Sequence, residues 1–149
     1  IGPHRLYGDS TFQRGCVGLC DCLVGEELPI RGTFALVDIA QDPLLSEFMA
    51  TFAVVNVRWQ VDLDGAGPDE AVLVRGFGTY NVGGEVAVEQ RLILDLEIGA
   101  EPEARFDSGR VRGGAGFPLI DARIANGDPL CFQTVIDVQA RPRRPNRRR

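Results

Sequence analysis

The sequence contains a single histidine, His4, and no lysine. Catalysis by Ser-His-Asp or Cys-His groups needs a positioned imidazole. His4 lies within residues 1–15, which show no periodicity and carry Gly, Pro, Asp and Ser, so we expect a flexible leader there. Asp107 and Ser108 therefore have no dependable histidine partner. The sequence predicts no catalytic residue of these types, and we expect a protein that is not an enzyme.

A C-x-x-C motif is also absent, which argues against a redox site and against the paired knuckles of structural zinc. The four cysteines are Cys16, Cys20, Cys22 and Cys131. Their even number favours disulfides, for which three pairings exist. We favour Cys20 or Cys22 bonded to Cys131, with a short local loop through Cys16. The distant bridge would close a loop of about 110 residues and stabilise the fold by roughly 4–5 kcal/mol. Free thiols in a cytosolic protein are the alternative.

No stretch approaches the roughly 18 consecutive apolar residues of a membrane span. The chain begins at Ile1 and not at Met, which is compatible with a signal peptide that has been removed. Disulfides form in oxidising compartments, so we expect a secreted or cell-surface protein. A length of 149 residues with 44% hydrophobic residues is typical of one globular domain.

Basic charge is concentrated at the C-terminus. All 16 basic residues are arginine, and six of them lie in residues 141–149, "RPRRPNRRR". The preceding 140 residues carry 10 arginines against 21 acidic residues. We expect a disordered Arg/Pro tail that binds polyanions only generically, without specific recognition of nucleic acid, because it contains no aromatic residues.

Alternating polar and apolar residues dominate the chain after residue 30. Residues 55–63, "VNVRWQVDL", place one apolar residue at every second position, as a strand with one wet face does. Residues 85–98 and 130–140 repeat the pattern, and Gln90 interrupts it once. The predicted inward residues are Val55, Val57, Trp59, Val61 and Leu63; Val86, Val88, Leu92, Leu94, Leu96 and Ile98; and Leu130, Phe132, Ile136, Val138 and Ala140.

Weaker alternating runs lie at residues 30–40, 71–82, 103–111 and 117–125, and Gly-, Pro- and Asp-rich turns separate them. We predict an all-β fold over residues 16–140, an antiparallel sandwich or small barrel of about seven strands. The one helix candidate is short and lies near residues 43–50.

Two further sites are candidates from composition. Asp62, Asp64, Asp69 and Glu70 offer hard oxygen ligands to calcium, but they do not follow the EF-hand spacing. A solvated acidic hairpin loop is the favoured interpretation, and we expect no cofactor. If the sheet closes into a barrel, its interior would hold a small apolar ligand. The lining would be Val57, Trp59, Leu92, Leu94 and Ile136.

Several segments, including "VRWQV", "GTYNVGGEVAVEQRLILDLEI", "RFDSGRVRGG" and "CFQTVIDVQA", resemble an uncharacterised family of secreted bacterial proteins. The resemblance covers about residues 16–140. It implies a compact all-β extracytoplasmic domain and assigns no catalytic residue.

From these features we expect a non-catalytic binding or structural module that contacts a protein or a surface polymer. A small apolar-ligand carrier and a carboxylate-based hydrolase are the alternatives.

Overall fold

The structure is a computed structural model that describes residues 2–16, 20–39, 49–63, 70–84 and 87–144. Within these ranges the chain forms strands and no helix. The strands are β1 (Gly2–Leu6), β2 (Thr11–Cys16), β3 (Leu28–Asp38), β4 (Met49–Val61), β5 (Val72–Gly83), β6 (Glu89–Ile98), β7 (Ala104–Asp107), β8 (Val111–Arg112), β9 (Ile120–Gly127) and β10 (Phe132–Pro142).

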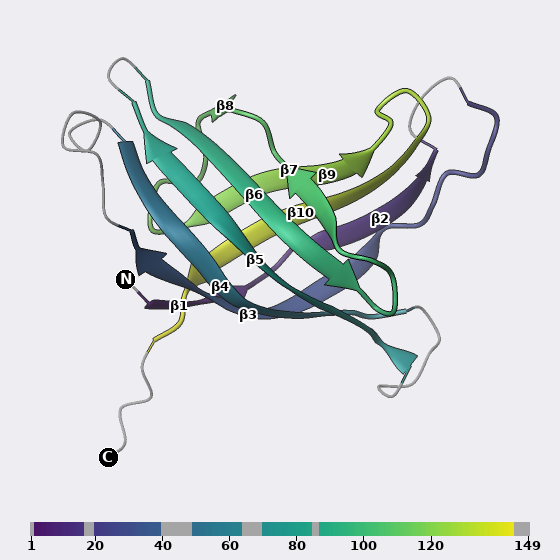
Figure 1. Cartoon of the computed structure of the whole chain (residues 1–149), viewed down its shortest axis with the longest axis horizontal. Coiled ribbons are helices and arrows are strands. Elements are labelled where there is room, and N and C mark those ends of the chain that lie inside the picture. Colours follow the sequence, from purple (N-terminus) through teal and green to yellow (C-terminus); the bar gives the residue numbers. More distant parts are fainter. Residues whose placement is uncertain (1, 17–19, 40–48, 64–69, 85–86, 145–149) are drawn as a thin grey trace.

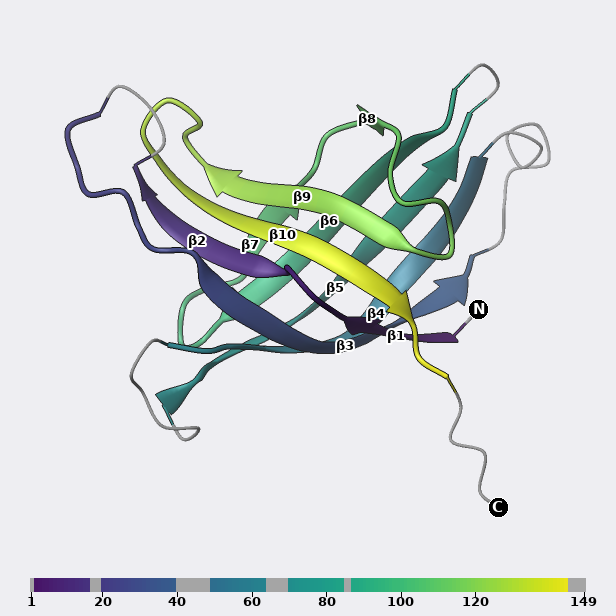
Figure 2. The same cartoon turned by 180° about the vertical axis from the view of Figure 1, so that it is seen from behind.

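The strands pair antiparallel in the order β1-β10-β2-β3-β4-β5-β6-β7-β9, and a further β9–β10 pairing closes the sheet into a ring. Closure is narrow at one place, because β7 and β9 share only the pair Asp107 and Ala125. Figures 1 and 2 show β4, β5 and β6 crossing over the layer formed by β2, β9 and β10. The prediction of an all-β antiparallel sandwich or small barrel is confirmed.

The N-terminal segment is part of the sheet. β1 pairs with both β3 and β10, and β2 continues along the same two neighbours. His4 is fully buried, its ring stacks on Phe34, and its Nε2 lies 3.0 Å from the carbonyl oxygen of Pro118. The prediction of a flexible leader over residues 1–15 is therefore wrong for residues 2–15. Pairing with distant strands orders a segment that has little periodicity of its own.

Two other predicted boundaries shift. A helix was predicted near residues 43–50, but β4 begins at Met49, so residues 49 and 50 belong to a strand. Residues 40–48 lie outside the described residues. The predicted disordered tail begins too early, because Arg141 and Pro142 pair with β1 and the Arg143 N–H donates to the carbonyl oxygen of Pro3 over 2.8 Å. Residues 145–149 lie outside the described residues.

The predicted inward face of β6 is confirmed from Leu92 to Ile98, although Val88 is exposed. Gln90, the interruption in the pattern, is buried. It accepts a hydrogen bond from the Tyr80 hydroxyl over 2.9 Å and donates to the carbonyl oxygen of Asp121. Burial raises the pKa of Tyr80 to about 12, which keeps this hydroxyl a donor. One polar residue on the inward face thus links three strands.

In β10 the predicted face is correct only from Ile136 onward. Leu130 and Phe132 are 66% and 51% exposed, because residues 128–131 form the turn from β9 and Phe132 is the first residue of the strand.

A β-bulge at Asn56 divides β4. The β4–β5 register shifts between Val54 and Val57, and Asn56 has a φ of 54°. Before the bulge Phe52 and Val54 are buried, whereas after it Val57, Trp59 and Val61 are buried. One extra residue reverses which side chains face inward. Val55, predicted to face inward, is consequently only half-buried, and Arg58 and Gln60 point outward.

Candidate functional site

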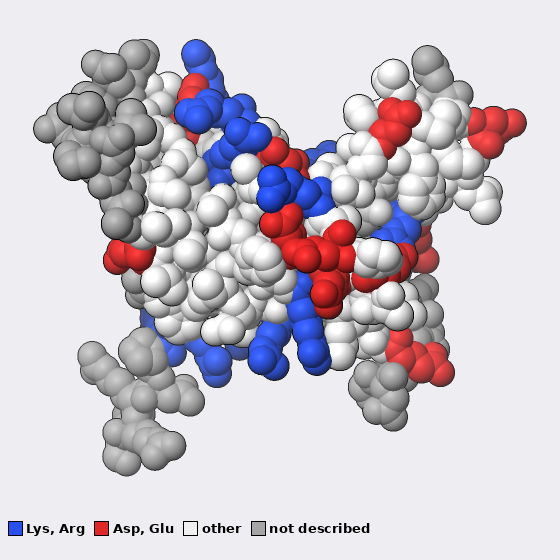
Figure 3. All heavy atoms as spheres, viewed as in Figure 1, with Lys and Arg blue, Asp and Glu red and all other residues white. Residues whose placement is uncertain are grey.

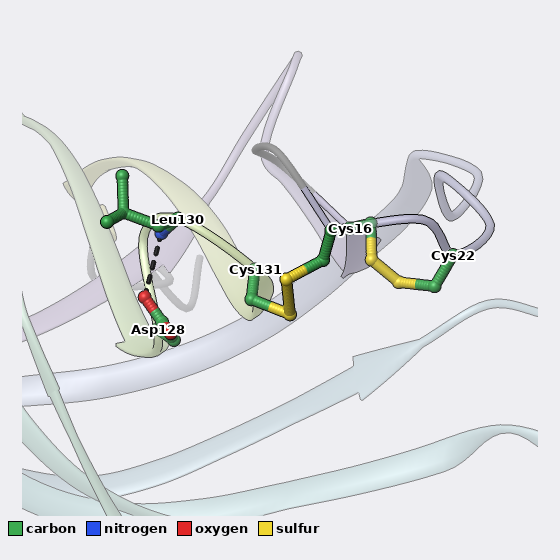
Figure 4. Close-up of a disulfide and its surroundings, with 6 residues drawn as sticks. Cys16, Cys22, Asp128, Leu130 and Cys131 are labelled. Atoms are coloured by element: carbon green, nitrogen blue, oxygen red, sulfur yellow. Dashed lines mark hydrogen bonds between the residues drawn. A yellow bond between two sulfur atoms is a disulfide. The ribbon is translucent and has the colours of Figure 1, made fainter.

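The predicted disulfides are present, and of the two pairings that we favoured the structure shows Cys20–Cys131 with Cys16–Cys22 (Figure 4). Their Cα atoms lie 5.6 Å and 4.9 Å apart, within the range for disulfides. Cys20–Cys131 joins the segment after β2 to the turn before β10. Four bonded cysteines are compatible with an extracytoplasmic protein.

The segment between the disulfides and β3 lies against β2. The Cys16 N–H donates to the Leu23 carbonyl oxygen over 3.1 Å, and the Gln13 Nε2 donates to the Gly25 carbonyl oxygen over 2.8 Å. A Cβ at Gly25 would overlap the Arg14 carbonyl oxygen, so glycine permits this close approach. The disulfides and hydrogen bonds together hold this segment to the sheet.

An open groove of about 550 Å³ lies on the outer face of β1, β3, β4 and β5. We call it the arginine groove. No acidic residue occurs among the described residues that line it. They are Arg5, Leu6, Arg31, Gly32, Thr33, Arg58, Trp59, Gln60, Leu73, Val74, Arg75 and Arg143. Five guanidinium groups therefore surround one concave surface on a chain whose formal net charge is −5.

The strand register places several of these side chains in one line, which we call the arginine row. Arg141 of β10 is opposite Arg5 of β1, and Arg5 is opposite Thr33 of β3. Thr33 is opposite Arg58 of β4, which is opposite Arg75 of β5. Directly opposed residues share a face, so the row crosses five neighbouring strands on the outside of the ring. Glu97 of β6 occupies the next position and ends it.

Several arginines outside the arginine groove pair with carboxylates. Arg14 binds Glu101 with two contacts of 2.8 Å, and Arg91 and Arg105 make two-pronged pairs with Asp107 and Asp95. In the arginine groove only Arg31 has such a partner among the described residues, Asp62 at 3.3 Å. Figure 3 shows blue side chains gathered along the lower edge, where β1, β3 and β4 lie in Figure 1. The groove therefore presents four guanidinium groups that have no ion-pair partner among the described residues.

A second basic groove adjoins the first. It has a volume of about 700 Å³ and is lined by Arg5, Arg141, Pro142, Arg143 and Arg144. Arg5 and Arg143 line both grooves, so the positive surface is continuous. The Arg141 guanidinium lies 5.2 Å from the centre of the Tyr7 ring, a cation–π contact that orients it.

A groove of about 500 Å³ elsewhere on the surface has the opposite character, with Asp9, Glu27 and Asp137 in its lining. Burial raises the pKa of Asp137, and the neighbouring Asp121 and Glu27 add to the effect, while Arg123 opposes it. These carboxylates are candidates for the pair that a carboxylate-based hydrolase needs. That function stays a prediction.

The structure describes only two of the four predicted calcium ligands. Asp62 pairs with Arg31 and accepts a hydrogen bond from the Gln60 amide over 3.3 Å, and Glu70 is exposed. Asp64 and Asp69 lie outside the described residues. Among the described residues, no three metal-ligating side chains cluster.

The five residues predicted to line an apolar ligand cavity all belong to the packed core. Val57, Trp59, Leu92, Leu94 and Ile136 are each no more than 2% exposed and belong to one cluster of buried residues. Trp59 also reaches the floor of the arginine groove, and its buried Nε1 has no hydrogen-bond partner among the described residues. The carrier function also stays a prediction.

Sequence reasoning missed the arginine groove. Arg31, Arg58 and Arg75 each occupy an outward position in a predicted strand, which was the available signal. Arg5 lay in the supposed leader. Which strands are neighbours, and in which register, was not readable from one-dimensional patterns.

No family model matches this chain, and no curated protein or solved structure matches it either. Within the described residues, the structure also lacks a helix of the length and hydropathy needed to cross a lipid bilayer.

Proposed function

We propose that this all-β, disulfide-linked domain is an extracytoplasmic, non-catalytic binding module whose ligand is anionic. The arginine groove is its contact surface. One observation carries the proposal: the guanidinium groups of Arg5, Arg58, Arg75 and Arg143 line one groove and have no carboxylate partner among the described residues. A guanidinium binds carboxylate, sulfate or phosphate oxygens through two parallel hydrogen bonds, which makes arginine well suited to anions.

The cost of this arrangement supports a binding role. Like charges directly opposite each other destabilise a sheet, and two such pairs, Arg141–Arg5 and Arg58–Arg75, occur here. None of these four guanidinium groups forms an ion pair with a carboxylate among the described residues, whereas Arg91 and Arg105 on β6 and β7 each do. An anionic ligand supplies the missing counter-charge.

Isothermal titration calorimetry with dextran sulfate tests the proposal, and neutral dextran serves as the uncharged reference. Replacing Arg58 and Arg75 by Gln together removes two charge-assisted contacts and should weaken binding at least about tenfold. The matched control replaces Arg112 and Arg123, which are exposed on β8 and β9 outside both basic grooves.

The control variant has the same net charge as the groove variant and should bind like the unmodified protein. Equal affinity of the two variants would show that binding depends on overall charge and not on the groove. A third variant, with Arg148 and Arg149 replaced by Gln, measures what the C-terminal arginines contribute.

A further inference from the structure

We infer that the arginine row receives a linear acidic polysaccharide, a carbohydrate chain with carboxylate or sulfate groups, laid across the strands from Arg141 to Arg75. This inference rests on the proposed function and adds the ligand class and its direction. Neighbouring strands lie about 4.8 Å apart, so the four intervals of the row span roughly 19 Å. A compact anion would contact one or two of its guanidinium groups, whereas an extended chain contacts all four.

The arrangement of the row fits a ligand with charged and neutral groups. Thr33 separates Arg5 from Arg58, and Gln60 lies beside Arg58 on β4 in the same groove. A hydroxyl and an amide both donate and accept hydrogen bonds. They match the hydroxyl groups that a sugar chain presents between its acidic groups.

Other polyanions fit the groove less well. Single-stranded nucleic acid is held by stacking of its bases on exposed aromatic rings. The only aromatic residue among the described residues that line the two basic grooves is Trp59, which is 2% exposed, and the Tyr7 ring beside them carries the Arg141 guanidinium on one face. An acidic peptide commonly binds by adding a strand to a free edge. Here β1, β3, β4 and β5 are each paired on both sides, so no backbone edge is available.

The charges at the two ends of the arginine row determine in which direction the polysaccharide continues. Beyond Arg75 the row meets Glu97, which repels an anionic chain. Beyond Arg5 it runs onto Arg141, Arg143 and Arg144 in the second basic groove. The polysaccharide therefore leaves the groove on the β10 side, where Figure 2 shows the C-terminal end of β10 beside β1.

The experiment measures affinity against ligand length. Size-fractionated sulfated dextran oligosaccharides and oligogalacturonates, which carry sulfate and carboxylate respectively, are titrated into the full chain, with inorganic sulfate as the compact anion. Affinity should rise with length until the oligosaccharide spans the row and then level off. With four charge contacts, affinity for the long chain should fall about 50-fold when salt rises from about 50 to about 200 mM.

Two variants test the row itself. Arg141→Gln should weaken binding of long oligosaccharides several-fold and leave short ones unaffected, because only a long chain reaches β10. Thr33→Val, which keeps the shape and removes the hydroxyl, should weaken the long chains as well. Arg123→Gln is the matched control for charge. Circular dichroism of each variant verifies that the sheet is intact.

The outcomes separate the two proposals. If no anion binds, or if the Arg58/Arg75 variant binds like its control, the proposed function itself is wrong. If inorganic sulfate binds this groove as tightly as the longest oligosaccharide, the groove binds anions but the extended ligand is wrong. Tighter binding of poly(dT) or polyglutamate than of an oligosaccharide of equal charge would assign the row to nucleic acid or to peptide.

Discussion

Arg58 of β4 and Arg75 of β5 lie directly opposite each other on the outer face of the sheet, and neither has an ion-pair partner among the described residues. Asp95 of β6 and Arg105 of β7, by contrast, are directly opposed and bind through contacts of 2.9 and 3.2 Å. The same fold thus holds cross-strand pairs of like charge and of opposite charge. Replacing one arginine of each kind of pair and measuring the free energy of unfolding therefore tests whether the like-charged pair destabilises the sheet.

Arg58→Gln should raise the free energy of unfolding by roughly 0.2–1 kcal/mol, because it removes the cross-strand repulsion with Arg75. Arg105→Gln changes the net charge equally but should lower stability by a similar amount, because it breaks the pair with Asp95. Urea denaturation at low ionic strength measures both. A loss of stability in the Arg58 variant would contradict the view that this arginine is retained for binding.

The two disulfides should differ in their contribution to stability. The Cys20–Cys131 bridge has a sequence separation of 111, and loop-closure entropy gives it about 4–5 kcal/mol. The Cys16–Cys22 bridge has a separation of 6, for which the same relation gives about 2 kcal/mol. Replacing each pair by serine and comparing thermal denaturation tests the order. Equal losses would indicate that the entropy of the unfolded chain does not govern the effect.

The bulge at Asn56 should tolerate glycine but not valine. A β-branched residue at a φ of 54° is strained, so Asn56→Val should cost about 1–3 kcal/mol. Asn56→Gly should leave stability nearly unchanged, because glycine adopts this conformation freely. Chemical denaturation of the two variants gives the comparison. A valine variant as stable as the glycine variant would show that β4 can pair with β5 without the bulge.

Asp137 should destabilise the fold at neutral pH. Its pKa is raised in the folded protein, mainly by burial, so ionisation opposes folding at any pH above that raised value. Asp137→Asn should therefore increase stability at pH 7 by up to about 1 kcal/mol. The gain should disappear below a pH of about 3.9, where the carboxyl is protonated in both states. Unfolding measured across this range tests the sign, with exposed Glu103→Gln as the control.

How much could be predicted depended on distance along the chain. Leu92 to Ile98 were correctly placed on the inward face because alternation within one strand is a local property. The cysteine spacing similarly limited the disulfides to a few pairings, one of which the structure shows. The prediction for Val55 was wrong because one bulged residue at Asn56 reverses the alternation, and nothing in the pattern marks it.

The amino-acid sequence alone predicted that this chain forms antiparallel strands and favoured a disulfide between its N-terminal part and Cys131. Only the tertiary structure decided that residues 2–6 form a strand and that Arg5, Arg58, Arg75 and Arg141 lie in one row. The reason is physical. Side-chain alternation arises from the geometry of a single strand, whereas the register between strands depends on how the whole ring packs its core.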